Sequence, residues 1–212
     1  MNRALTVVPL VAALVACAPP TARAATGVTL ISTGRPTSAS VAQLRVADRG
    51  GYPAYSRAAF GPGWADPDRN GCDARNDVLR RDLTAVRLRR GSNCIVESGT
   101  LSDRYTGKTI TFKRGYGTSG AVQIDHVVPV ADAWRSGAWR WTPAQRAAFY
   151  NDPRNLVAVA GPVNQAKSDK AADRFLPAVN KCRYAATVVT VKVTYSLTVT
   201  PAERAALIGA CE

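Results

Sequence analysis

The sequence predicts an α+β fold, in which a small antiparallel sheet packs beside several helices and two disulfides cross-link the chain. Short segments of alternating, β-branched residues predict the strands, and residues 109–112 are the clearest example. A capping residue followed by proline, as in Thr142-Pro143 and Thr200-Pro201, predicts where helices begin. An even number of cysteines after residue 24 predicts the disulfides.

The length of the chain favours one domain. At 212 residues it is long enough for one full hydrophobic core and leaves little for a second. We divide it into a signal peptide at residues 1–24, a flexible lead-in with a short helix at 25–50, and a single domain at 51–212. The short helix is expected at residues 40–47.

The N-terminus has the features of an export signal. A basic start precedes an apolar run at residues 4–16, which is too short to span a membrane, and Ala22-Arg23-Ala24 fits a cleavage site. Leu14-Val15-Ala16-Cys17 offers a second ending, because it resembles a lipobox and would anchor the protein at the cell surface through a lipid on Cys17. We favour free secretion, because the cleavage site follows the Pro19-Pro20 break.

The charge of the chain favours polyanionic partners. There are 28 Lys and Arg residues against 15 Asp and Glu, which gives a formal net charge of +13. Removal of residues 1–24 would delete Arg3 and Arg23 and no acidic residue, so the mature protein would carry +11. Nucleic acid, anionic membrane and anionic cell-wall polymer all fit this charge, which does not choose among them.

The four cysteines outside the export signal allow three connectivities. We favour Cys72–Cys94 and Cys182–Cys211, because each pair closes a local loop. The second pair would tie a C-terminal helix to the segment after the central motif. A zinc cluster or a cysteine nucleophile is disfavoured, because the chain has no CxxC pair and its one histidine belongs to another motif.

Residues 122–170 hold the side chains with catalytic chemistry. The only histidine, His126, directly follows Asp125 inside an apolar run that predicts a strand. Side chains alternate along a strand, so these two would serve one site only if the chain bends, and Pro129 favours an end to regular pairing there. A second strand is expected at residues 155–159.

A helix is expected directly after the second strand. Gly161-Pro162 predicts its first turn, and Asn164, Lys167, Ser168 and Ala171 would share one face. The order strand, strand, helix would bring His126, Asn155 and Asn164 to one corner of the domain.

These residue types suit the hydrolysis of a phosphodiester. A neutral imidazole accepts a proton from water near neutral pH, because the ordinary pKa of histidine is about 6.5. The Asp125 carboxylate and the Asn164 amide oxygen are ligands that a hard divalent cation prefers. Such a cation would stabilise the negative charge that builds on the phosphate and the leaving oxygen.

The pattern Asp-His-x-x-Pro at residues 125–129, then Asn155, then Asn-x-x-Lys-Ser-Asp at 164–169, resembles the HNH nucleases, also called ββα-metal or His-Me finger nucleases. The likeness is greatest to small secreted bacterial proteins related to the C-terminal domain of the GmrSD restriction enzymes. It extends upstream to Tyr55-x-Arg57-x-x-Phe60-Gly61 and Gly71-Cys72-Asp73-x-Arg75.

This resemblance, which covers residues 52–184, implies a ββα-metal (HNH) core and a role for each residue of the motif. His126 would be the general base, and Asn155 would help to set its imidazole. Asp125 and Asn164 would bind one divalent metal ion, with Mg²⁺ favoured over Mn²⁺ or Ca²⁺. The product would carry a 5′-phosphate.

Residues 66–77 leave three interpretations open. They match the calcium-loop template at positions 1, 3, 5 and 6 and place Asp77 at position 12. An Asx-rich turn that leads into a helix at 75–83 is favoured, because Asp77 is shorter than the usual Glu. By resemblance, Arg75 on this helix would reach the scissile phosphate, which is the third interpretation. Separately, Lys167 is expected to contact phosphate from the face of the later helix.

The remaining segments are assigned by the same signals. Residues 130–134 and 144–150 predict helices, and the β-branched run 186–199 predicts one longer strand before a terminal helix that begins at Thr200. Residues 115–120 spell GxGxxG, but they precede a strand instead of opening a helix, so we interpret them as a loop and not as a dinucleotide site.

The sequence therefore predicts a secreted, monomeric HNH endonuclease that acts on DNA, with RNA as a second candidate. Weak sequence specificity is expected, because no recognition helix is evident. The alternative is a non-enzymatic basic module that binds anionic polymer at the cell envelope, with calcium in the loop at 66–77. That alternative explains the charge and the disulfides, but it does not explain the combination of Asp125, His126, Asn155 and Asn164.

Overall fold

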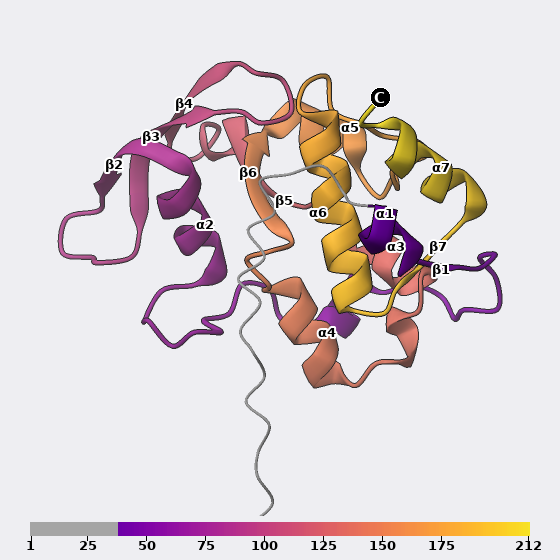
Figure 1. The fold of residues 1–212 in the computed structure, drawn as a ribbon. Helices are drawn as coiled ribbons and strands as arrows, with labels where there is room; N and C mark the ends of the chain where they lie inside the picture. The colour runs from indigo at the N-terminus through magenta and orange to yellow at the C-terminus, as the bar shows by residue number, and fades with distance from the viewer. Residues whose placement is uncertain (1–37) are drawn as a thin grey trace, which may run out of the picture. The chain divides into compact units, whose positions relative to one another are not determined.

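The computed structural model describes residues 38–212, whose helices and strands are shown in Figure 1. The expected signal peptide, both of its candidate endings and residues 25–37 of the lead-in lie outside the described residues. The architecture is α+β with small sheets and surrounding helices, which confirms the predicted class. In the part of the chain that is described, no helix is both long enough and apolar enough to cross a membrane.

Residues 38–212 contain short helices and short strands in alternation. The α-helices are α1 (Ser38–Ala42), α2 (Ala74–Asp82), α3 (Val130–Arg135), α4 (Pro143–Tyr150), α5 (Gly161–Lys167), α6 (Lys181–Thr194) and α7 (Pro201–Gly209). The strands are β1 (Arg45–Val46), β2 (Leu83–Leu88), β3 (Val96–Ser102), β4 (Thr109–Lys113), β5 (Val122–His126), β6 (Leu156–Ala160) and β7 (Thr198–Val199). Three 3-10 turns complete the described chain: η1 (Arg57–Phe60), η2 (Ser119–Ala121) and η3 (Ala138–Arg140).

The strands form three separate sheets within the described residues. β2, β3 and β4 make an antiparallel sheet, β5 and β6 make an antiparallel hairpin, and β1 pairs in parallel with β7. Helix α2 packs on the three-stranded sheet, where Leu79 joins Leu101 and Phe112 in one hydrophobic cluster. Gly99 of β3 permits the close approach of β2, because a Cβ at that position would lie 2.8 Å from a methyl carbon of Leu83 and 3.2 Å from the backbone carbonyl oxygen of Thr84.

The β5–β6 hairpin has a hydrophobic cluster on each face. Ile124 pairs with Ala158, and both belong to the cluster that contains α2 and the three-stranded sheet. Val157 and Val159 belong to the second cluster, together with buried residues of α3, α4, α6 and α7. β6 is therefore apolar along its whole length, whereas β5 is apolar at Val122 and Ile124 and polar at its other three positions.

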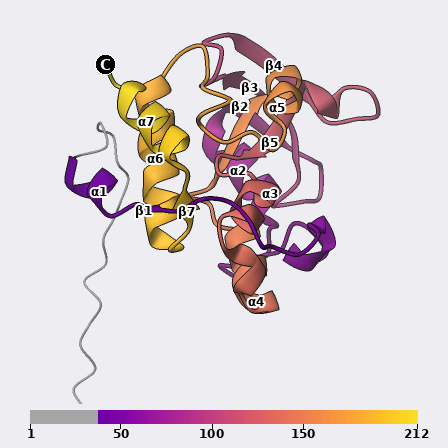
Figure 2. The same cartoon turned by 90° about the vertical axis from the view of Figure 1, so that its right-hand side faces the viewer.

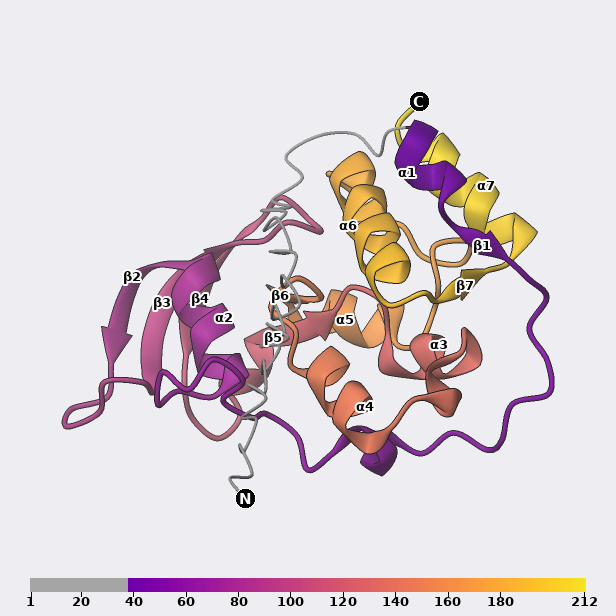
Figure 3. The same ribbon diagram turned by 60° about the horizontal axis from the view of Figure 1, so that its bottom comes forward.

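Helix α5 follows the hairpin directly. Gly161 is its first residue, and a Cβ there would lie 1.9 Å from the carbonyl oxygen of Gly120, so only glycine fits. The helix has Pro162 in its first turn, as predicted, but it ends at Lys167 because Ser168 has a φ of 51°. The predicted continuation through Ala171 is therefore wrong. Figure 3 shows β5 and β6 between the three-stranded sheet on the left and α5 and α6 on the right.

The predicted strand at residues 186–199 is also wrong. Residues 181–194 form α6, and only Thr198–Val199 form a strand. The buried side chains of α6 recur at helical spacing, among them Ala185, Val188 and Val189. Their burial against the core and against α7, which lies beside α6 in Figure 2, outweighs the β preference of the valines and threonines.

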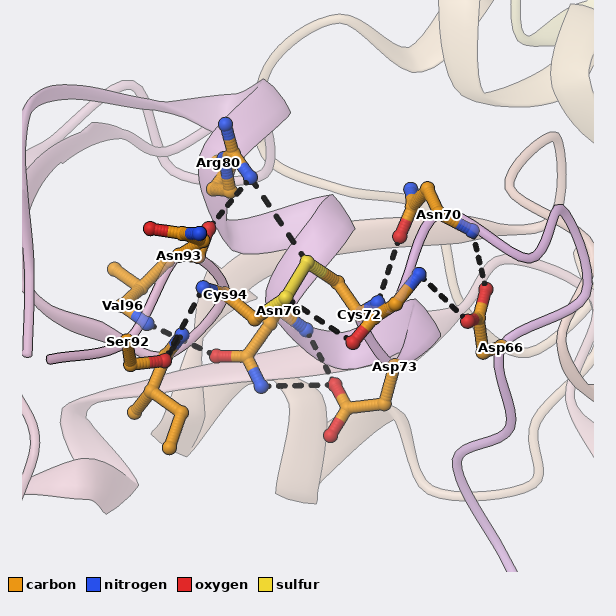
Figure 4. Close-up of a disulfide and its surroundings, with 12 residues drawn as sticks. Asp66, Asn70, Cys72, Asp73, Asn76, Arg80, Ser92, Asn93, Cys94 and Val96 are labelled. Carbon is orange, nitrogen blue, oxygen red and sulfur yellow. Dashed lines mark hydrogen bonds between the residues drawn. A yellow bond between two sulfur atoms is a disulfide. The ribbon is translucent and has the colours of Figure 1, made fainter.

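Both predicted disulfides are present. Cys72–Cys94 links the start of α2 to the segment before β3, and Figure 4 shows its surroundings. Cys182–Cys211 links the start of α6 to the C-terminal end of the chain beyond α7. The predicted helix at residues 40–47 is shorter than expected, because α1 ends at Ala42 and β1 follows it.

Residues 66–77 form the Asx-rich turn. The Asp66 carboxylate accepts hydrogen bonds from two backbone N–H groups of the turn. Asp73 caps α2, because its carboxylate accepts from the backbone N–H of Asn76 at 2.8 Å (Figure 4). These carboxylates therefore hold the backbone. Within residues 38–212, no group of three or more His, Cys, Asp or Glu side chains is arranged to hold a metal ion.

Candidate active site

A cavity of about 370 Å³ opens beside the end of β5 and the helix α5. Three residues of the predicted site, Asp125, His126 and Asn164, line this one cavity. Asn155 and Lys167 lie behind the lining, where both are fully buried. The complete lining consists of Tyr55, Arg57, Ile124, Asp125, His126, Pro129, Val130, Ala131, Asn164, Ser168 and Asp169.

Asp125 is buried, and each of its carboxylate oxygens accepts a hydrogen bond. Oδ1 accepts from Lys167 Nζ at 2.9 Å, and Oδ2 accepts from the Tyr105 hydroxyl at 2.6 Å. Burial raises the pKa of the Asp125 carboxyl, although the Lys167 charge and the Tyr105 hydrogen bond act against it. Burial and the nearby Asp125 charge hold the pKa of Tyr105 well above its usual range, so its hydroxyl stays a donor.

His126 is held on the opposite side of the strand. Its Nε2 lies 2.8 Å from the carbonyl oxygen of Tyr150, and its ring stacks on Trp64 with a centroid separation of 5.7 Å. A carbonyl oxygen only accepts, so Nε2 carries the proton and Nδ1 is the unprotonated nitrogen of the neutral ring. Nδ1 has no hydrogen-bond partner among the described residues.

The two side chains reach one cavity because β5 ends at His126. The last register pair of the hairpin is His126 with Leu156, and Pro129 precedes the first residue of α3. The chain therefore turns immediately after the Asp125-His126 pair. The alternation of side chains along a strand required such a turn for Asp125 and His126 to serve one site.

The His126 imidazole is neutral in this environment. Burial is the main cause that lowers its pKa to about 3, and the positive charges of Arg57 and Lys167 add to the effect, while the bond to Tyr150 opposes it. The neutral form is the one that accepts a proton. So low a pKa makes the ring a weak base, and a bound phosphate would raise the pKa by placing negative charge nearby.

Asn155 holds the backbone that follows His126. Its Oδ1 accepts from the Val128 N–H at 2.8 Å, and its Nδ2 donates to the Val128 carbonyl at 3.1 Å. Its own carbonyl accepts from the Val127 N–H at 2.8 Å. Any influence of Asn155 on the imidazole therefore passes through the main chain.

Asp125 and Asn164 provide the donor atoms that a divalent ion requires. Asn164 Nδ2 donates to Gln123 Oε1 at 2.9 Å, which leaves Oδ1 as the atom that would bind a cation. Each Asp125 oxygen accepts one hydrogen bond and retains a second lone pair. A carboxylate and an amide oxygen fit a Mg²⁺ ion that keeps most of its water ligands. The Lys167 charge beside Asp125 opposes tight binding of a second cation.

Lys167 and Arg75 lie outside the cavity lining. Lys167 Nζ donates to the His126 carbonyl oxygen at 2.9 Å as well as to Asp125, and a phosphate contact would require it to leave both. Arg75 lies on α2 beside Arg114, and its pKa is lowered by burial and by the Arg114 charge. Phosphate contacts by Lys167 and Arg75 stay predictions.

Four residues that surround the Asp125-His126 pair were not assigned a role from the sequence: Arg57, Trp64, Tyr105 and Tyr150. Arg57 belongs to the Tyr55-x-Arg57 segment of the resemblance, which was the one available signal. Trp64 and Tyr105 lie far from the motif in the sequence and reach it only through tertiary packing. Tyr150 lies between the two halves of the motif, at the end of α4, and no sequence signal linked it to His126.

The fold and the cavity define a class of α+β protein in which an antiparallel hairpin and the following helix present Asp, His and Asn to one cavity. The sequence pattern of the family "GmrSD restriction endonucleases, C-terminal domain" matches residues 73–210, and the chain belongs to this family. An uncharacterized secreted protein of Arthroderma benhamiae is 40% identical over 179 residues, which cover 80% of this chain and 83% of that protein. No solved structure matches the chain.

Proposed function

We propose that the protein is a secreted endonuclease that hydrolyses phosphodiester bonds of DNA, with His126 as the general base. The observation that carries this proposal is the neutral imidazole, fixed by the Tyr150 carbonyl, in the cavity that Asp125 and Asn164 also line. Membership of a family named for restriction endonucleases supports it. RNA is the second candidate substrate.

In the proposed reaction, His126 Nδ1 takes a proton from a water molecule. The water oxygen attacks phosphorus in line with the leaving oxygen, so one P–O bond forms and the P–O3′ bond breaks. The 3′ oxygen leaves with the electron pair of the broken bond and takes a proton from solvent water, which makes it a hydroxyl. His126 Nδ1 gives its proton back to solvent, so the imidazole is neutral again. The resemblance to HNH nucleases supports a product with a 5′-phosphate.

Asp125 and Asn164 would hold one divalent ion, with Mg²⁺ favoured and Mn²⁺ and Ca²⁺ as alternatives. Such an ion supplies positive charge at the non-bridging and leaving oxygens. Lys167 and Tyr105 keep the Asp125 carboxylate in place, and Asn155 fixes the loop after His126. Together these contacts fix the position of Asp125, which would bind the metal ion, relative to His126, which would be the base.

The charge of the chain supports the proposed substrate, and the name of one similar protein supports the proposed location. The formal net charge of +13 favours a polyanionic substrate, and a similar protein is named as secreted. We infer an extracellular monomer that cuts DNA with weak sequence specificity, with the lipid anchor at Cys17 as the alternative to free secretion.

Plasmid cleavage by the oxidised protein from residue 25 onward tests the proposal. Mg²⁺-dependent nicking that is lost with EDTA and in His126→Ala is the expected result, with the fold of the variant checked by circular dichroism. Near-normal cleavage by His126→Ala would overturn the assignment. Salt-sensitive DNA binding with no cleavage under any divalent ion would instead favour the envelope-binding module.

A further inference from the structure

Arg57 is the one cationic side chain that lines the cavity in the described part of the chain. It is exposed, and within residues 38–212 it forms no ion pair with a carboxylate. Its Nη2 donates to the Tyr150 hydroxyl at 2.9 Å, and its guanidinium also interacts with the hydroxyl of Tyr55. Both contacts are neutral, so the positive charge of Arg57 has no acidic partner.

The backbone that carries Arg57 is fixed on both sides. Trp134 Nε1 donates to the Pro53 carbonyl oxygen at 2.8 Å, and Arg146 Nε donates to the Ala59 carbonyl oxygen at 2.8 Å. Phe60, the last residue of η1, is fully buried. The guanidinium therefore extends toward the cavity from a segment whose backbone is held in place by hydrogen bonds and burial.

Tyr150 contacts both Arg57 and His126. Its carbonyl oxygen accepts from His126 Nε2 at 2.8 Å, and its hydroxyl accepts from Arg57. Its ring centroid lies 4.6 Å from that of His126 and 5.2 Å from the guanidinium carbon of Arg57. One residue at the end of α4 thus sets the relative positions of the imidazole and the guanidinium.

We propose that Arg57 binds a non-bridging oxygen of the phosphodiester that is attacked by the water molecule activated by His126, and that Tyr150 is the positioning residue for both groups. This rests on the proposed function. A guanidinium presents a planar fork of N–H donors that matches phosphate oxygens. Because Arg57 forms no ion pair with a carboxylate, it can bind a phosphate without breaking one. The same charge would stabilise the negative charge that develops on the phosphate during attack.

Cleavage kinetics on a short DNA duplex in Mg²⁺ test the proposal. We expect Arg57→Ala to lower kcat by about 100-fold, in the range found for loss of one donor to a developing oxyanion. Arg57→Lys should recover only part of this loss, because a lysine lacks the fork. Tyr150→Phe keeps the carbonyl that holds His126 and removes only the hydroxyl, so a smaller loss of about threefold to tenfold is expected.

Arg183→Ala is the matched control, since Arg183 is an exposed arginine on α6 that does not line the cavity. Its kcat should stay within about twofold of the wild type. Sulfur substitution of one non-bridging oxygen gives a readout that a structural role would not move. The rate penalty of one stereoisomer should shrink in Arg57→Ala relative to the wild type.

DNA binding in EDTA separates failure of this inference from failure of the proposed function. The slope of log affinity against log salt should fall by about one in Arg57→Ala and not in Arg183→Ala. If the wild type cleaves, His126→Ala does not, and both arginine variants behave alike in kinetics and binding, only the inference is overturned. If neither the wild type nor any variant cleaves DNA, the proposed nuclease function is overturned. A salt slope that still falls in Arg57→Ala would then show that Arg57 binds phosphate without taking part in cleavage.

Discussion

Lys167 Nζ lies 2.9 Å from Asp125 Oδ1, and the two side chains are only 0% and 5% exposed. The same ammonium group donates to the His126 carbonyl oxygen at 2.9 Å. One buried cation therefore fixes the carboxylate of Asp125 and the backbone of His126 together. Lys167, for which a phosphate contact stays a prediction, thus holds the two central residues of the site in place.

Loss of Lys167 should destabilise the fold. In Lys167→Met, the Asp125 carboxylate would stay buried without its cation, so the free energy of unfolding should fall by about 3–5 kcal/mol. Urea denaturation in EDTA measures this without a contribution from bound metal. The double variant Lys167→Met with Asp125→Asn should lose less than the sum of the single losses. Strict additivity would show that the pair does not interact.

Asn155 should stabilise the fold through the two hydrogen bonds that its side chain forms with the backbone of Val128. In Asn155→Ala, both the N–H and the carbonyl of Val128 would lose a buried partner, and the free energy of unfolding should fall by about 2–4 kcal/mol. Asn93→Ala is the control, because Asn93 is exposed, and its change should stay below about 0.5 kcal/mol. Equal effects in the two variants would refute the role of Asn155 in the loop.

Asp152 should give the fold a pH-dependent contribution. Its carboxylate accepts from the Tyr195 hydroxyl at 2.7 Å and from Arg154, and although burial acts to raise its pKa, these hydrogen bonds leave the pKa below the ordinary value of 3.8. Because the folded-state pKa is lowered, this stability is fully present above about pH 4 and is lost as the pH falls through the folded-state value.

Asp152→Asn tests this contribution. Its free energy of unfolding should be about 2 kcal/mol below that of the wild type at pH 7, since hydrogen bonds to a charged group are lost. The gap should narrow between pH 4 and pH 2, as the wild-type carboxyl becomes protonated. Denaturation curves at pH 7, 4 and 2.5 measure it, and a gap that stays constant with pH would contradict the assignment.

Local signals were sufficient to predict the elements that carry the site. The apolar runs of β5 and β6 and the Gly161-Pro162 start of α5 are contained in short stretches of sequence, and the structure confirms these elements. The loop pairings of Cys72–Cys94 and Cys182–Cys211 were equally local. These features depend on neighbours along the chain, so spacing and composition revealed them.

Contacts between distant segments were not predictable in this way. Tyr105 bonds to Asp125 from the turn between β3 and β4, and Trp64 stacks on His126 from a loop without regular structure. No periodicity links such positions. The strand wrongly expected at 186–199 has the same cause, because its burial against the rest of the core decides its conformation and propensity does not.

Asn164→Ala should weaken the dependence of cleavage on metal more than it weakens DNA binding. The substitution removes one oxygen ligand and leaves Asp125 as the remaining protein ligand of the proposed ion, so the Mg²⁺ concentration for half-maximal rate should rise by about tenfold or more. Gln165→Ala is the matched control, because Gln165 is an exposed neighbour on the same helix that does not line the cavity. DNA binding in EDTA should stay within about twofold of the wild type for both variants, since one neutral amide contributes no ion pair to phosphate. A Mg²⁺ titration of Asn164→Ala that overlays the wild type would remove Asn164 from the proposed metal site and leave the role of His126 to be judged by its own variant.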